Sequence, residues 1–135
     1  MIGLDTNVIV RFLTKDEPAQ FLMAQQELGR LTPQHPGFVT DVVLAELYWV
    51  LTRAYGLDKA QVLATIETLV NQAEIRVENH GRIERAIRAA HDGADLPDAL
   101  IAEACRAAGA QDIINFDRKA ATALGLRLIS KQQRR

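Results

Sequence analysis

The sequence predicts a single α/β domain over residues 1–135, built on a mainly parallel β-sheet. Short apolar segments alternate with helical patterns along the chain, and a parallel sheet needs this order because a helix carries each crossover. Apolar residues make up 48% of the 135 positions, which is enough for a buried core. Since no break in composition divides the chain, one domain is expected.

The expected elements follow from hydrophobic spacing and from capping residues. Strands are predicted at 2–4, 38–39, 75–77, 112–116 and 126–129. Helices are predicted at 8–13, 18–31, 42–55, 59–72, 80–91, 97–108 and 117–124. The strands at 2–4 and 112–116 are expected to be buried. The helix at 42–55 is also expected to be buried nearly all round, because Glu46 is its one charged residue between Val42 and Leu51.

Charge, cysteine content and apolar run lengths exclude several classes of protein. The net charge of −1 argues against a protein that grips nucleic acid through a general basic surface. The single cysteine, Cys105, cannot form an internal disulfide, which suits a reducing compartment. No apolar run reaches the ~20 residues of a membrane span, and the opening residues lack the pattern of a secretory signal. We therefore expect a cytoplasmic protein with no membrane partner.

Acids recur at the predicted junctions between strands and helices. Asp5, Asp98 and Asp117 stand at helix starts, Glu46 lies about one turn into its helix, and Asp95 precedes Asp98 by three residues. Each has an ordinary structural explanation, since a short acid caps free helix N–H groups and Glu46 could pair with an arginine. In a parallel sheet, however, successive junctions of this kind fall along one edge, so four or five acids could meet there.

Carboxylates gathered at one edge repel one another, so they take up protons or hold a cation. Oxygen ligands without Cys or His favour Mg²⁺ or Mn²⁺, which commonly meet phosphate oxygens and assist attack on a phosphodiester. The chain has no glycine-rich phosphate loop, which makes hydrolysis of a polymer backbone a better fit than nucleotide binding.

The ordered set of these motifs resembles the PIN-domain family, and more narrowly the VapC-type toxins of prokaryotic toxin–antitoxin pairs. The resemblance covers essentially the whole chain and rests on four segments: Asp5-Thr6-Asn7, Glu46 in its apolar helix, residues 98–102, and residues 115–118.

This resemblance implies an α/β/α sandwich and an Mg²⁺- or Mn²⁺-dependent endoribonuclease. The implied catalytic and metal-binding residues are Asp5, Glu46, Asp98 and Asp117, with Asp95 as an additional metal ligand and with Thr6, Asn7 and Asn115 in support. It also implies an RNA substrate, a cognate antitoxin protein that holds the enzyme inactive, and a homodimer or a larger toxin–antitoxin complex.

One position departs from the family pattern, and two other functions remain as alternatives. Asn115 stands where many relatives carry Thr or Ser, so its part in placing an attacking water is open. A PIN-like RNA- or protein-binding module without catalysis is the first alternative. A phosphoacceptor signalling domain is the second, and it fits less well because Thr6 and Asn7, rather than a second acid, follow Asp5.

Overall fold

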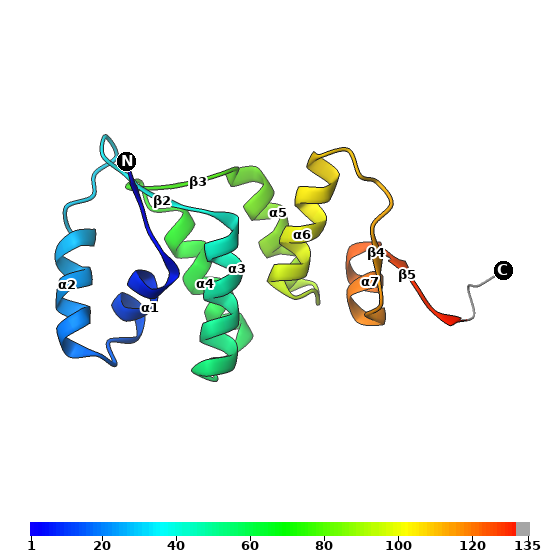
Figure 1. The fold of residues 1–135 in the computed structure, drawn as a ribbon, viewed down its shortest axis with the longest axis horizontal. Coiled ribbons are helices and arrows are strands. Elements are labelled where there is room, and N and C mark those ends of the chain that lie inside the picture. The colour runs from blue at the N-terminus through cyan, green and yellow to red at the C-terminus, as the bar shows by residue number, and fades with distance from the viewer. Residues whose placement is uncertain (132–135) are drawn as a thin grey trace. The chain divides into compact units, whose positions relative to one another are not determined.

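The computed structural model describes residues 1–131, which form two compact units. The first runs from Met1 to His80 and the second begins at Gly81, and each is described by itself. Figure 1 traces the elements of both along the chain. Within this described part, no helix combines the length and the apolar character needed to cross a membrane. Whether the two units make one domain over 1–135 stays a prediction.

The N-terminal unit is built on a three-stranded parallel sheet. Its strands are β1 (Ile2–Gly3), β2 (Gly37–Val39) and β3 (Ile75–Val77), in the order β1-β2-β3. Ile2 pairs with Gly37, and Val39 pairs with Val77. The predicted α/β order and parallel pairing are therefore confirmed in this unit, and the carboxyl ends of its strands lie at one edge.

Helices connect these strands and begin where the sequence supplies a cap. They are α1 (Thr6–Thr14), α2 (Pro18–Leu28), α3 (Asp41–Trp49) and α4 (Lys59–Val70), with a π-helical segment η1 (Val50–Ala54) directly after α3. Thr40 caps α3, because its Oγ1 accepts a hydrogen bond from the Val43 amide at 3.1 Å. Pro18 occupies the first turn of α2, where its missing N–H costs nothing.

The core of the N-terminal unit comes mainly from α3 and α4. Its fully buried side chains include Val39, Leu44, Leu47, Leu51, Leu63 and Ile66. Burial of one such side chain contributes roughly 1.5–3 kcal/mol. Because α1 packs against both α2 and α3, this core fixes the start of α1 relative to α3.

Up to residue 131, the second unit contains three helices and a two-stranded parallel sheet. Its elements are α5 (His80–His91, which begins at the boundary), α6 (Leu96–Ala107), β4 (Ile114–Asn115), α7 (Arg118–Leu124) and β5 (Arg127–Leu128). Arg106 Nη2 donates a hydrogen bond to the Leu124 carbonyl at 2.5 Å, which links α6 to the end of α7. Gly125 ends α7 in the left-handed conformation at φ 69°, as its position predicts.

Three predictions of burial are wrong. Ile2 is 52% exposed and Ile114 is 54% exposed, because each lies in a two-residue strand with one described partner strand. The helix expected to be buried nearly all round instead exposes Val42, Glu46 and Trp49. These residues are four and three positions apart and share one face, so apolar composition concealed an outward side.

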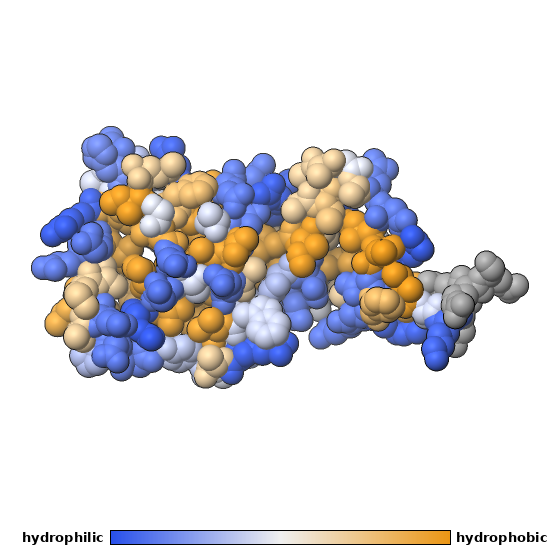
Figure 2. All heavy atoms as spheres, viewed as in Figure 1, coloured by the Kyte–Doolittle hydropathy of each residue, from blue (hydrophilic) through white to orange (hydrophobic). Residues whose placement is uncertain are grey.

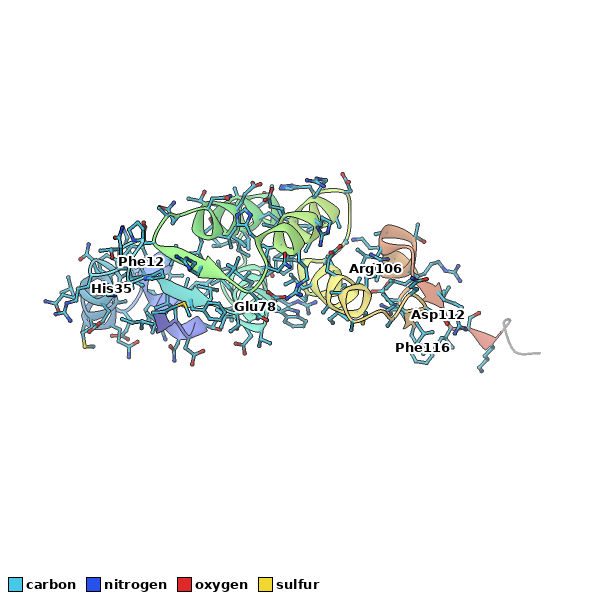
Figure 3. All side chains as sticks on the ribbon, turned by 90° about the horizontal axis from the view of Figure 1, so that it is seen from above. Phe12, His35, Glu78, Arg106, Asp112 and Phe116 are labelled. Atoms are coloured by element: carbon cyan, nitrogen blue, oxygen red, sulfur yellow. The ribbon has the colours of Figure 1, made fainter. Side chains whose placement is uncertain are left out.

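Both units leave large apolar side chains in contact with solvent. Figure 2 shows orange apolar atoms between blue hydrophilic ones over each unit. The most exposed aromatic ring is Phe116, at 81%, which projects from the C-terminal unit away from α7 (Figure 3). Such side chains are candidates for contact with partner molecules.

Candidate functional site

Two of the predicted site acids lie in the N-terminal unit, and Thr6 contacts both. The Thr6 amide donates to Asp5 Oδ1 at 2.7 Å, and Thr6 Oγ1 donates to Glu46 Oε1 at 2.7 Å. Thr6 is only 9% exposed, whereas Asp5 and Glu46 are exposed. One threonine therefore places two solvent-facing carboxylates beside each other.

The sheet explains why Thr6 and Glu46, which are 40 positions apart, meet. Asp5 follows β1 and caps α1, while Glu46 lies in the helix that follows β2. Because β1 and β2 are parallel neighbours, both helices begin at the same edge of the sheet. The capping role expected for Asp5 is thus present, and it uses Oδ1.

The environment predicted for Glu46 is different from the one observed. The sequence suggested a carboxylate in a buried helix, with an arginine as its simplest partner. Glu46 instead lies on the exposed face of α3, and its hydrogen-bond partner is the Thr6 hydroxyl. Since a hydroxyl adds no positive charge, the carboxylate keeps its capacity to bind a cation.

The other three predicted acids line one small hollow in the C-terminal unit. Asp95, Asp98 and Asp117 share it with Lys119 and with small residues of the loop before α6. Its volume of about 10 Å³ leaves room for about one water molecule. Asp95 stands at the N-cap of α6 but makes no capping hydrogen bond with its side chain, and Asp98 lies in the first turn of that helix.

The electrostatics of this hollow act most clearly on Asp98. Partial burial raises the pKa of the Asp98 carboxyl, and the nearby charges of Asp95 and Asp117 raise it further. Each of these causes disfavours the ionised form. Burial and two neighbouring acids therefore disfavour the ionised form of Asp98, in a hollow that Lys119 also lines.

Local hydrogen bonds hold Asp117 at the start of α7. The Asp117 amide donates to Asn115 Oδ1 at 2.7 Å. Asp117 Oδ1 in turn accepts from the Lys119 amide at 2.9 Å and from the Ala120 amide at 3.4 Å. Asn115 thus holds the backbone of Asp117, which is a different role from the placing of an attacking water that the sequence left open.

The predicted site residues consequently form two groups. Asp5, Thr6 and Glu46 belong to the N-terminal unit, and Asp95, Asp98, Asn115 and Asp117 belong to the C-terminal one. Asn7 is exposed and lines a separate hollow between α1 and α2 with Arg11 and Gln20.

The carboxylate oxygens of these groups are suitable ligands for a hard divalent cation, although the side chains are not arranged as a metal site. Over residues 1–131, no cluster of three or more His, Cys, Asp or Glu side chains is arranged to hold a metal ion. All the clustered donors are nevertheless carboxylate oxygens, the ligands that Mg²⁺ and Mn²⁺ prefer. The raised pKa of Asp98 indicates that a cation would relieve the repulsion in its hollow.

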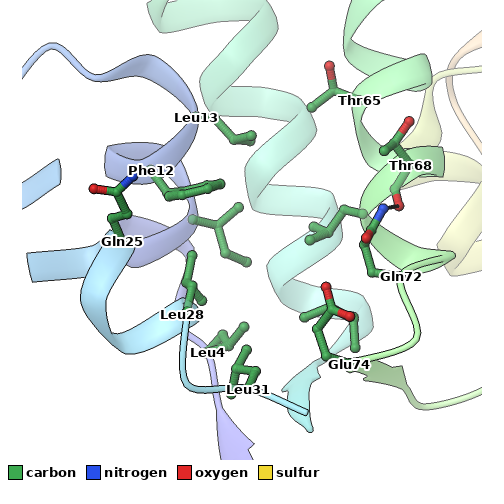
Figure 4. A pocket seen from close by; sticks show the side chains of 14 residues that line it. Leu4, Phe12, Leu13, Gln25, Leu28, Leu31, Thr65, Thr68, Gln72 and Glu74 are labelled. Atoms are coloured by element: carbon green, nitrogen blue, oxygen red, sulfur yellow. Dashed lines mark hydrogen bonds between the residues drawn. The ribbon is translucent and has the colours of Figure 1, made fainter. Parts of the chain in front are cut away.

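A larger apolar hollow lies on the N-terminal unit, between α1, α2 and α4 (Figure 4). Its volume is about 550 Å³. Leucines such as Leu4, Leu28 and Leu31 line one side, and Thr65 and Thr68 of α4 stand on the other. Its lining is apolar enough to receive a hydrophobic partner.

One surface feature escaped the sequence analysis. The Arg53 guanidinium lies over the ring of Trp49, 3.9 Å from its centre, on the helical segment that carries Glu46. The four-residue spacing of Trp49 and Arg53 in a predicted helix could have indicated this contact.

The hydrogen bond between Thr6 and Glu46 predicts a measurable cost for Thr6→Val. This change keeps the shape of the side chain and removes the hydroxyl, so the free energy of unfolding should fall by about 1 kcal/mol. Urea denaturation measures it. Thr68→Val is the control, because that hydroxyl bonds the Ala64 carbonyl of its own exposed helix face. Equal losses in both variants would contradict a special role for Thr6.

The raised pKa of Asp98 predicts that Asp98→Asn stabilises the protein without divalent cations. A carboxyl whose pKa is higher in the folded state favours folding when protonated, and this contribution is lost as the pH rises through the folded pKa. The variant should therefore exceed the wild type in unfolding free energy at pH 7, and the difference should vanish toward acidic pH.

The control for this pH series is Asp92→Asn, which removes an exposed acid outside the hollow. Denaturation between pH 3 and 8 in a chelating buffer gives both curves. A loss of stability in Asp98→Asn at pH 7 that vanishes toward acidic pH would instead show that the Asp98 charge is favourable at the helix start.

Comparison with known proteins identifies the family. No curated protein matches the chain. The profile described as PIN domain matches residues 2–123, which include all five acids and span most of both units. The match confirms the predicted fold class, an α/β/α sandwich with parallel strands. The chain belongs to the PIN domain family, whose members are generally nucleases.

Proposed function

We propose that this PIN domain protein is a metal-dependent endoribonuclease and the toxin of a VapC-type toxin–antitoxin pair. The observation that carries the proposal is the hollow lined by Asp95, Asp98 and Asp117. There, burial and the nearby charges of Asp95 and Asp117 raise the pKa of Asp98. In a nuclease family, a hollow lined by three acids is suited to a cation that meets phosphate oxygens.

The proposal assigns the acids of both units to one reaction within a single domain of residues 1–135. Asp5, Glu46, Asp98 and Asp117 would hold Mg²⁺ or Mn²⁺, with Asp95 as an additional ligand. When bound, the cation supplies positive charge to the phosphodiester and makes a water a better nucleophile. The match of one family profile across both units supports this assignment.

The chain's own residues would orient this chemistry. Thr6 fixes the positions of Asp5 and Glu46 through two hydrogen bonds, so neither carboxylate has to be ordered when substrate arrives. Asn115 and the amide of Lys119 do the same for Asp117. Holding these side chains in advance reduces the entropy that substrate binding must overcome.

The proposed partners are an RNA substrate, a cognate antitoxin and a second copy of the chain, all in the cytoplasm. The apolar hollow between α1, α2 and α4 supports a protein partner, because a helix with one apolar face can fill such a groove. A basic side chain of the antitoxin would complement the carboxylates and block the site.

The alternatives fit these observations less well. A binding module without catalysis would not need a repulsive group of acids that lowers its own stability. A phosphoacceptor domain would need a second acid after β1, where Thr6 is instead engaged with Glu46.

Cleavage of a mixed, structured RNA pool tests the proposal. The wild type should give discrete products with Mg²⁺ or Mn²⁺ and none with EDTA. Asp5→Asn and Asp98→Asn should each reduce the rate by about a hundredfold or more, because each removes one charged ligand. Gel electrophoresis of end-labelled RNA measures these rates.

Asp92→Asn, an exposed acid outside both groups, serves as the matched control and should cleave like the wild type. Folding of each variant is checked by circular dichroism, so that a lost site is not confused with a lost fold. Full activity in Asp5→Asn and Asp98→Asn, or cleavage that persists in EDTA, would refute the assignment.

A further inference from the structure

The exposed face of α3 and η1 carries an aromatic ring and a cation in direct contact. Trp49 is the one tryptophan of the chain and is 48% exposed. The Arg53 guanidinium lies 3.9 Å from its ring centre. Arg53 is itself exposed, so the pair is available to a ligand from solvent.

A second aromatic–cation pair in the same unit differs from the pair of Trp49 and Arg53 in the burial of its ring. Lys15 Nζ lies 5.3 Å from the ring centre of Phe21, but Phe21 is partly buried and stacks on Phe12 at 5.9 Å. That ring is therefore part of the packing between α1 and α2. Trp49 contributes a large exposed ring on the outward side of its helix, where packing gives no reason for one.

The location of the pair connects it with the proposed site. Trp49 follows Glu46 by three residues, a spacing that puts their Cβ atoms about 5–6 Å apart on one helix face. Glu46 is held by Thr6 beside Asp5. The ring consequently shares a helix face with Glu46, one of the acids proposed to act on the RNA backbone, and Thr6 links Glu46 to Asp5.

The backbone is also irregular at this point. The chain changes from α- to π-helix directly after Trp49, and the Tyr55 amide donates to the Val50 carbonyl at 3.1 Å, five residues earlier. Segments of π-helix occur frequently at functional sites. Arg53 lies within the π-helical segment, and its guanidinium lies over the Trp49 ring.

Aromatic rings and arginine planes are the usual platforms for unpaired bases. Every base has a flat face that can stack on tryptophan, and a neighbouring arginine adds attraction to phosphate. The net charge of −1 means that general attraction to RNA is weak, so a local stacking contact would have a large effect.

We infer that Trp49 and Arg53 form a binding subsite for an unpaired nucleotide of the RNA, adjacent to Glu46 and Asp5. The base stacks on the ring face of Trp49 that Arg53 leaves open, and Arg53 faces the RNA backbone. This inference rests on the proposed ribonuclease function. It assigns a contact with the substrate to two residues outside the group of acids.

Intrinsic fluorescence tests the inference directly, because Trp49 is the one tryptophan of the chain. The probe is a hexamer of uridine, compared with an abasic hexamer that has the same phosphates and no bases. Titrations use the full chain with Asp98→Asn, so that cleavage does not consume the probe. We expect the uridine hexamer to quench the fluorescence at saturation and the abasic hexamer to leave it nearly unchanged.

Substitutions separate stacking from charge. Trp49→Leu should weaken binding of a labelled uridine hexamer by about five- to a hundredfold, and Trp49→Phe should recover part of this loss. In the wild-type background, Trp49→Leu should raise KM more than it lowers kcat. Phe21→Leu is the matched control, since it removes a ring from the packed aromatic–cation pair, and its RNA binding should equal that of the parent protein.

Failure of the subsite and failure of the function give different results. If wild-type protein cleaves RNA but Trp49→Leu has an unchanged KM, or if the abasic hexamer quenches as strongly, the subsite is refuted and the function stands. If the wild type neither cleaves nor binds RNA, both are refuted. If fluorescence changes with protein concentration alone and Trp49→Leu abolishes self-association, the ring belongs to a contact with a second copy and the subsite is refuted.

Discussion

Repulsion between carboxylates is the constraint on which the functional account depends. Asp98 is partly buried close to Asp95 and Asp117, and its raised pKa records the free energy that this arrangement costs. Asp117 also caps α7, but helix capping does not require three acids to line one hollow. A cation and a phosphate group would make the arrangement favourable, so the electrostatic cost indicates function.

The N-terminal unit also holds two acids in place, and it does so through hydrogen bonds from Thr6. Thr6 binds one carboxylate through its amide and another through its hydroxyl, and the parallel pairing of β1 with β2 brings the two acids together. Trp49 follows Glu46 on α3, and Arg53 follows on η1. Glu46 and the pair of Trp49 and Arg53 thus lie along one continuous helical segment, α3 and η1.

The sequence predicted features that depend on local chemistry. Caps at Asp5 and Asp117 follow from short-range hydrogen bonding, and the structure has both. The contact of Thr6 with Glu46 could not be predicted, because it depends on pairing between strands far apart in sequence. The exposure of Trp49 was also missed, because an apolar residue looks the same on either side of a helix.

The central proposal is that Asp5, Glu46, Asp98 and Asp117 bind one divalent cation. A titration of Mn²⁺ into the full chain, followed by electron paramagnetic resonance of the free ion, tests it most directly. The account predicts that Asp5→Asn and Asp98→Asn, one in each unit, both abolish the same tight binding step. Unchanged Mn²⁺ binding in Asp5→Asn would contradict the account, because the acids of the C-terminal unit would then hold the cation without those of the N-terminal one.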